Sequence, residues 1–196
     1  MLWANATNQT MENNSGTNKV KFQFAHALSR LGFTVKLKGE SSTDATITLK
    51  KITLAGSASA TESTPGAFYT SGAIDLAAGS WDKTTLNNKQ NLDWFSGSQK
   101  VTSTSQSNTD FNTGYLFVIP QEFSGANELY VIVEYTIEGY NGVTTPMTNK
   151  VHKQLEKNFE QGKAYTINLT IGLTPIEFNA TVDGWGDIED YPITLE

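Results

Sequence analysis

The chain has 196 residues, no cysteine and a formal net charge of −6, with 14 basic residues against 20 acidic ones. This length suits one domain with a substantial core. The lack of cysteine excludes a disulfide framework, a thiol nucleophile and a cysteine-ligated metal, and the acidic balance argues against a nucleic-acid-binding protein. Only 17% of the residues are charged, which is typical of exported β-proteins covered by hydroxyl and amide groups.

The first 18 residues are expected to form a flexible polar leader, because residues 5–18 are polar apart from Ala6 and Met11. They lack the basic and apolar layout of a signal peptide. No stretch approaches the roughly 18 consecutive apolar residues of a membrane-spanning helix. We therefore expect residues 19–196 to form a single domain.

The next stretch is predicted to organise the fold as a strand, a short helix and a second strand. Val20, Phe22 and Phe24 alternate with polar residues, which is the pattern of a half-buried strand. Residues 25–31 are good helix formers and are followed by a glycine, so one or two helical turns are expected there. The alternation resumes at residues 33–37.

Residues 45–54 form another predicted strand, but its apolar positions change parity between Leu49 and Ile52. Such a change is typical of a β-bulge or a bend, which lets one strand serve two sheets. Short strands are expected further on, at residues 67–69, 74–76, 81–86 and 92–95. Turns are expected at residues 71–72, 78–80, 87–91 and 96–99.

The strongest strand signal is at residues 129–138, which are rich in β-branched and aromatic side chains. The Asn141-Gly142 pair that follows predicts an antiparallel hairpin with residues 143–150. Pro146 cannot donate to a ladder, so it places the return strand at a sheet edge. The continuous apolar run at residues 115–120 predicts a strand covered on both faces.

Towards the end of the chain, residues 155–161 are expected to form a helical turn, and residues 164–171 and 176–182 to form strands. In total the pattern predicts an all-β sandwich of about seven to nine strands with Greek-key connections and one or two short helical turns. The residues expected in its core are Phe22, Phe24, Phe33, Val35, Val118, Val131, Val133, Ile167 and Leu169.

No catalytic constellation or cofactor-binding motif is found. His26 and His152 have no acidic residue at a metal-ligand spacing. The acidic stretch at residues 183–190 lacks the ligand spacing of a calcium loop, so a solvated turn is favoured. We expect a protein that is not an enzyme and binds no metal or cofactor.

Aromatic residues outside the core offer a second kind of site, because exposed rings stack on the faces of sugars. Trp81, Trp94 and Tyr140 are the candidates for glycan contacts. Core or rim packing is the alternative for each ring.

The final residues could form a strand, since Tyr191, Ile193 and Leu195 alternate with Pro192 and Thr194. This tail either completes its own sandwich at an edge or inserts into a neighbouring molecule as a donor strand. We favour the first alternative, because an unpaired apolar edge is costly.

The order of several motifs resembles that of the fimbrillin-like proteins of the Bacteroidetes, a family of fimbrial subunits and minor adhesins. The first is the pattern FxFxHxLSxLxFxV, at residues 22–35. The others are a strand ending in Ile119-Pro120-Gln121, a strand entry at residues 159–165 and a closing tryptophan motif at residues 181–185. These motifs span most of the chain.

The resemblance implies a transthyretin-like sandwich, and more specifically the C-terminal domain of a two-domain protein. It implies a cell-surface, outer-membrane location, with membrane attachment only through an upstream lipid anchor that this chain lacks. Its partners would be other fimbrial subunits or ligands on host or partner cells.

Two functions therefore stay open. The first is a structural or adhesive fimbrial subunit that assembles or docks by β-strand addition. The second is a surface glycan-binding module of a nutrient-capture system.

Overall fold

The structure is a computed structural model that describes residues 1–7, 10, 20–39, 45–60, 66–123, 128–142, 144–172, 177–184 and 193–194. Within these residues it is almost entirely β, with fourteen strands and one short 3-10 helix. In chain order the elements are β1 (Leu2–Trp3), β2 (Ala25–His26), β3 (Ser29–Leu37), β4 (Thr46–Ala55), β5 (Phe68–Asp75), β6 (Ser80–Gln90), β7 (Leu92–Lys100), β8 (Gln106–Ser107), β9 (Leu116–Val118), β10 (Tyr130–Glu138), η1 (Tyr140–Gly142), β11 (Met147–Gln154), β12 (Lys163–Ile171), β13 (Glu177–Gly184) and β14 (Ile193–Thr194).

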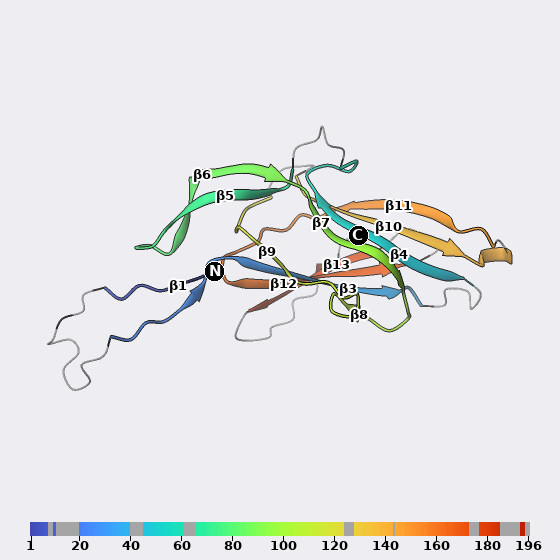
Figure 1. The fold of residues 1–196 in the computed structure, drawn as a ribbon, viewed down its shortest axis with the longest axis horizontal. Helices are drawn as coiled ribbons and strands as arrows, with labels where there is room; N and C mark the ends of the chain where they lie inside the picture. Colours follow the sequence, from blue (N-terminus) through green and yellow to red (C-terminus); the bar gives the residue numbers. More distant parts are fainter. Residues whose placement is uncertain are drawn as a thin grey trace.

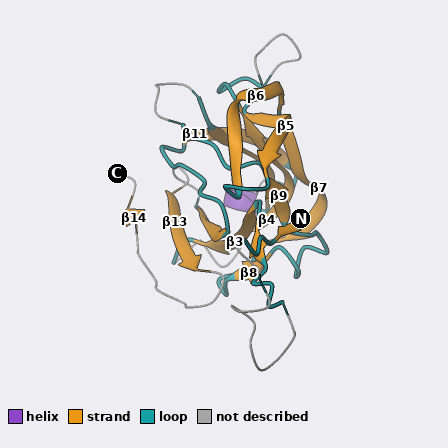
Figure 2. Cartoon of the chain, turned by 90° about the vertical axis from the view of Figure 1, so that its left-hand side faces the viewer, coloured by secondary structure: helices purple, strands orange, loops and turns teal. Residues whose placement is uncertain are grey.

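Two sheets form a sandwich, which confirms the predicted fold class. The upper sheet has the strand order β11-β10-β4-β7, and the lower sheet has the order β14-β13-β12-β3-β8, with β9 also paired to β3. Figure 1 shows the two sheets as separate layers. Seen along the long axis of the molecule, strands make up both layers and the short helix lies between them in projection (Figure 2).

The lower sheet contains a parallel pair, β3 and β12, whose register runs from Arg30 opposite Ala164 to Leu37 opposite Ile171. Parallel neighbours need a long crossover connection. Here the crossover includes all four strands of the upper sheet. The lower sheet therefore closes between segments that are far apart in the sequence.

The core lies between the two sheets. Seven of the nine residues predicted to lie in it are buried, from β3, β9, β10 and β12. The ring of Phe33 packs edge-on against Trp94 of the opposite sheet, with ring centroids 5.0 Å apart. The confirmed core residues are Phe33, Val35, Val118, Val131, Val133, Ile167 and Leu169.

Two core predictions are wrong: Phe22 is 57% exposed and Phe24 is 66% exposed. The stretch at residues 20–24 alternates as a strand does, yet it belongs to no sheet. An alternating pattern becomes a half-buried strand only where a second layer covers its apolar face, and no described layer covers this one.

The helix expected at residues 25–31 is also absent. Residues 25–26 form β2, and β3 already begins at Ser29. This segment bonds to distant parts of the chain: the Ser29 side-chain Oγ donates to the Glu160 carbonyl at 2.7 Å, and the Gly162 amide donates to the Leu28 carbonyl at 3.2 Å. Tertiary pairing thus overrides a weak helical preference.

The parity change in β4 is a β-bulge, as predicted. Lys51 pairs with Glu134 and Leu49 pairs with Tyr135, so Lys50 is the extra residue on this strand. The bulge lets apolar residues on both sides of it, including Leu49 and Ile52, face the same core. The strand stays in one sheet, so the expectation that it serves two sheets is wrong.

The hairpin predicted around Asn141-Gly142 is confirmed. Strands β10 and β11 pair antiparallel from Tyr130 opposite Gln154 to Ile137 opposite Met147. Strand β11 lies at an edge of the upper sheet, as the proline at position 146 predicted.

Other local predictions were wrong because hairpin pairing extends through polar residues. β5 and β6 are continuous through residues 71–72 and 87–90, and β7 runs through residues 96–99, where turns were expected.

Two further predictions are wrong for other reasons. Residues 155–161 form no helix, and Phe159 makes a β-bridge to Gln121 instead. β9 is covered on one face only, since Phe117 is 54% exposed.

Two elements extend beyond the sandwich at the same end of the molecule (Figure 1). One is the β5–β6 hairpin. The other, here called the N-terminal arm, consists of residues 1–7 and 20–26 and is closed by the β1–β2 pair.

Candidate functional site

The three aromatic residues predicted to contact glycans do not form one site. Trp94 is only 4% exposed and donates its Nε1–H to the Gly114 carbonyl, so it has no ring face for a ligand. Tyr140 is partly buried against the core, in η1. Trp81 lies on β6, at the other end of the molecule from η1 (Figure 1). The structure therefore contradicts a joint aromatic platform that includes Trp94.

Trp81 has a structural contact that the sequence did not suggest. Its Nε1–H donates to the Ala27 carbonyl at 2.7 Å. Ala27 lies just before β3, so this bond ties the projecting β5–β6 hairpin to the sandwich. The indole of Trp81 is partly exposed.

A groove of about 530 Å³ lies beside the β5–β6 hairpin. One wall is the β5–β6 hairpin, with Tyr69, Lys83 and Lys89. The other wall comes from residues 120–122 and 158–161. The groove is not predictable from the sequence, because the three chain segments that line it are far apart and none of them carries a motif of a binding site.

The base of the groove is held by Gln121, the last residue of the Ile-Pro-Gln motif. Its Nε2 donates to the Ala67 carbonyl at 2.7 Å, and its Oε1 accepts from the Tyr69 amide at 3.0 Å. Its backbone makes two further bonds with Phe159. Gln121 is 7% exposed and is therefore a buried side chain that positions β5 rather than a ligand contact.

Charged groups line the mouth of the groove. Lys83 Nζ lies 2.7 Å from Glu122 Oε1, and this hydrogen bond holds the pKa of the Glu122 carboxyl below its usual range. Lys89 Nζ lies 4.7 Å from the centroid of the Tyr69 ring. The groove thus combines the aromatic rings of Tyr69 and Phe159 with cationic, acidic and amide groups, which suits a polar ligand.

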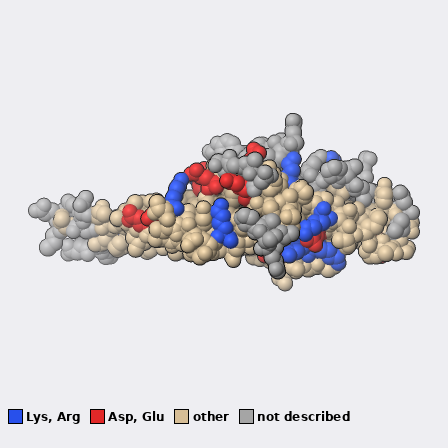
Figure 3. Space-filling view, turned by 90° about the horizontal axis from the view of Figure 1, so that it is seen from above, with Lys and Arg blue, Asp and Glu red and all other residues tan. Residues whose placement is uncertain are grey.

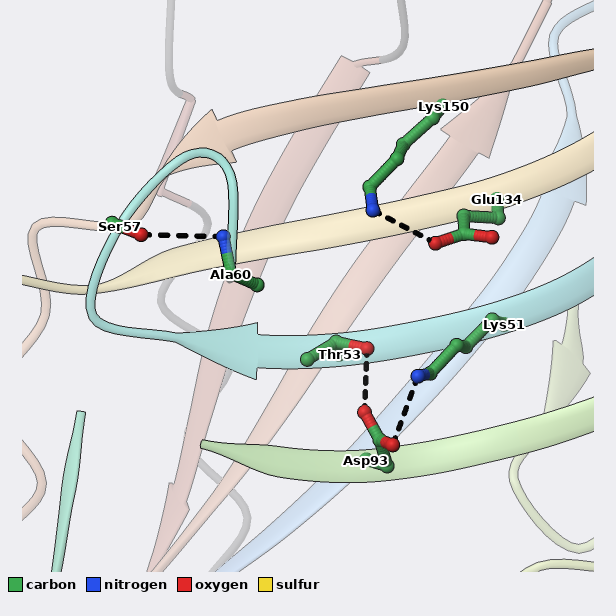
Figure 4. Close-up of polar contacts among 7 residues, drawn as sticks. All are labelled: Lys51, Thr53, Ser57, Ala60, Asp93, Glu134 and Lys150. Atoms are coloured by element: carbon green, nitrogen blue, oxygen red, sulfur yellow. Dashed lines mark hydrogen bonds and ion pairs between the residues drawn. The ribbon is translucent and has the colours of Figure 1, made fainter. Parts of the chain in front are cut away.

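Part of the outer face of the upper sheet carries polar and charged side chains that pair with one another (Figure 4). Asp93 accepts from Thr53 at 2.8 Å and pairs with Lys51 at 2.9 Å, while Lys150 pairs with Glu134 at 3.1 Å. Partial burial of Asp93 opposes its ionisation, but the bonds from Lys51 and Thr53 outweigh this effect and lower its pKa. These pairs join neighbouring strands and form no site.

The tail residue Ile193 lies in β14, which pairs antiparallel with β13 through Ala180 opposite Ile193 and Asn179 opposite Thr194. Tyr191 and Leu195 lie outside the described residues.

The N-terminal arm is fastened to the β5–β6 hairpin. The Trp3 indole lies against Gly79 in the hairpin turn so closely that a Cβ on Gly79 would overlap it. Asn5 Nδ2 donates to the Ala77 carbonyl at 3.1 Å, and Gln161 Nε2 donates to the Gly79 carbonyl at 2.7 Å. Two elements from distant parts of the sequence therefore meet at one end of the molecule.

Among the described residues, no group of three or more His, Asp or Glu side chains could hold a metal ion. His26 and His152 lie on β2 and β11, in different sheets. Burial and nearby positive charges lower the pKa of His26.

No helix in the described part of the chain is long and apolar enough to cross a membrane. Figure 3 shows lysines and acidic residues interspersed on one face, most of which is uncharged. No continuous row of basic side chains that could follow a nucleic-acid backbone is visible among the described residues of this face.

A family model described as fimbrillin-like matches residues 1–185. A fimbrial protein from Bacteroides vulgatus has a similar solved structure, with a TM-score of 0.66 and 22% identity over 90% of this chain. The match covers 59% of that longer protein, and at this identity it shows the fold alone. A candidate cell adhesion protein from Bacteroides uniformis matches with a TM-score of 0.47 and 18% identity, over 85% of this chain and 54% of the other. No curated protein sequence matches the chain.

Proposed function

Because the chain belongs to the fimbrillin-like family, we propose that it is a non-catalytic structural or adhesive subunit of cell-surface fimbriae. The observation that carries the proposal is the family match over residues 1–185, together with the sandwich fold. Its partners are other fimbrial subunits or ligands on host or partner cells. It acts outside the cell, at the outer membrane or on the fimbria.

Immunogold electron microscopy tests this role. Antibodies against the purified chain should label filaments on intact cells that express the protein, and the label should be lost when its gene is deleted. Labelling confined to the cell interior would contradict the proposal. As a biochemical check of the same location, protease treatment of intact cells should release the epitope.

We also propose that residues 19–196 act as one domain, equivalent to the C-terminal domain of two-domain family members. The similar Bacteroides vulgatus protein is longer than the matched region, which leaves room for a further domain in a protein of this fold. Attachment to the membrane would then come through an upstream lipid anchor.

The proposed mode of assembly is β-strand addition. A sheet edge offers unpaired backbone N–H and C=O groups to an incoming strand, and β11 is such an edge in the upper sheet. We infer that the tail at residues 191–196 completes its own lower sheet, which is supported by the pairing of β14 with β13.

Deletion of residues 191–196 tests this inference. If the tail completes its own sheet, the deletion should lower the melting temperature of the monomer by several degrees. An unchanged melting temperature together with lost self-association would instead make the tail a donor strand for a neighbour. The full chain measured at the same concentration is the control.

The alternative function is glycan capture at the cell surface, and the groove beside Tyr69 is the observation that favours it. A sugar could stack on the ring while amide and carboxylate groups bind its hydroxyls. A glycan array separates the two functions. Glycan capture would be favoured over a purely structural role if the monomer binds a specific glycan. This binding should be lost in Tyr69→Ala and kept in Trp94→Phe.

A further inference from the structure

The N-terminal arm has two faces with different surroundings. In the β1–β2 pair, Trp3 lies opposite Ala25 and Leu2 lies opposite His26. Successive side chains of an extended chain point to opposite faces. Trp3 faces the Gly79 turn of the β5–β6 hairpin, so Leu2 and Phe24 lie on the face that points away from the hairpin.

This second face, here called the apolar face, is large and hydrophobic. Val20 and Phe22 precede Phe24 on the same arm at alternate positions, and with Leu2 and Phe24 they make up the apolar face. The four side chains are 55% (Leu2), 45% (Val20), 57% (Phe22) and 66% (Phe24) exposed. Four exposed large apolar side chains on one short arm are an arrangement that marks an interaction site rather than scattered surface residues.

The size of the apolar face fits a pair of identical chains. With a Phe ring contributing roughly 200 Å², the four side chains expose roughly 400 Å² of apolar area in each chain. Two such faces in contact would bury roughly 800 Å², and since about 60% of a typical interface is apolar, the whole contact would bury roughly 1,300 Å². This area lies within the range of stable protein–protein interfaces.

The lack of charge on these four side chains is compatible with the same occupant. The chain carries a net charge of −6, so two copies repel each other through most of their charged surface. Leu2, Val20, Phe22 and Phe24 carry no charge, and His26, which lies opposite Leu2 on the same face, has its pKa lowered by burial and nearby positive charges, which favours its neutral form. Two copies related by a two-fold axis can pack their apolar faces against each other without burying charge.

We propose that the apolar face of the N-terminal arm is a homodimer interface, on which Leu2, Val20, Phe22 and Phe24 of one chain pack against the same residues of a second copy. This contact is separate from the strand addition proposed above. It joins two subunits side by side at the arm, whatever occupies the sheet edges.

Sedimentation equilibrium of the 196-residue chain tests the proposal. The chain should form a dimer at concentrations up to about 100 μM, and Phe22→Ser/Phe24→Ser should raise the dissociation constant at least tenfold. Both positions are exposed, so the variant should keep the near-UV circular dichroism of the native fold. Met147→Ser, at an apolar residue 41% exposed on β11, is the matched control and should dimerise normally.

Several results would overturn the proposal. A native chain that remains monomeric at about 100 μM lacks the interface. A double variant that dimerises as tightly as the native chain places the interface elsewhere, as does a dimer lost in Met147→Ser. Deletion of residues 191–196 should leave the dimer intact; if it abolishes the dimer, self-association belongs to strand addition instead.

Discussion

Three phenylalanines lie in segments with the same alternating pattern but differ in how deeply they are buried. Phe33 is 1% exposed between the two sheets, whereas Phe22 and Phe24 are more than half exposed on the arm. The free energy that a ring contributes depends on the neighbours that cover it, which the local pattern does not specify.

This difference predicts opposite effects of the same substitution. Phe33→Ala should lower the free energy of unfolding by about 3–5 kcal/mol, because it removes a ring from the packed core. Phe24→Ala should change it by less than about 0.5 kcal/mol. Urea unfolding of dilute protein measures both, and a large loss in Phe24→Ala would mean that the arm folds onto the sandwich.

Gln121 shows how one buried polar side chain positions a whole hairpin. Gln121→Met keeps the approximate volume but leaves the Ala67 carbonyl and the Tyr69 amide without their partner. Each buried group left unsatisfied costs about 1–3 kcal/mol, so we expect a loss in unfolding free energy within or above that range.

The matched control for Gln121 is Gln106 on β8, whose Oε1 accepts from the Thr102 amide and whose Nε2 donates to the Lys100 carbonyl, both in exposed surroundings. Gln106→Met should cost less than about 0.5 kcal/mol, because water can replace the lost partner. Equal losses in the two variants would contradict the role assigned to Gln121.

At the scale of elements, the contact between the N-terminal arm and the β5–β6 hairpin requires a glycine at position 79. Gly79 has φ at 71° and no room for a Cβ beside Trp3. Gly79→Ala should therefore separate the two elements, and the amide protons of β5 and β6 should exchange about tenfold faster or more.

Two other glycines separate backbone strain from the clash with Trp3. Gly142 also has a positive φ, of 76°, but has open space around it, and Gly114 has open space without a positive φ. Alanine at either position should leave exchange in β5 and β6 unchanged. Faster exchange of the hairpin in Gly142→Ala would mean that the effect is not specific to the contact with Trp3.

At the scale of the whole molecule, the sandwich closes through the parallel pair β3 and β12, which lie far apart in the sequence. Long-range pairing requires the loss of chain entropy before the contacts form. Refolding should therefore take milliseconds to seconds, as for other β-sandwiches. Stopped-flow circular dichroism measures this rate, and refolding complete within microseconds would contradict the topology.

The sequence by itself determined the elements whose signals are local. Alternation identified the core residues of β3, β10 and β12, Asn141-Gly142 identified the β10–β11 hairpin, and the parity change identified the bulge in β4. The order of the motifs was also enough to indicate the family, and the match over residues 1–185 confirms it. Each of these signals depends on neighbours a few residues apart, because side-chain direction and turn geometry repeat over short distances.

Only the tertiary structure decided which alternating segments are covered. Residues 20–24 have the pattern of a strand but no sheet, and residues 25–31 have helix formers but pair with distant segments. The groove beside Tyr69 also exists only because separate segments meet there. The physical reason is the same in each case. Burial and hydrogen bonding between distant segments contribute more free energy than local preference, and the residues of a segment do not specify which distant segment it will pair with.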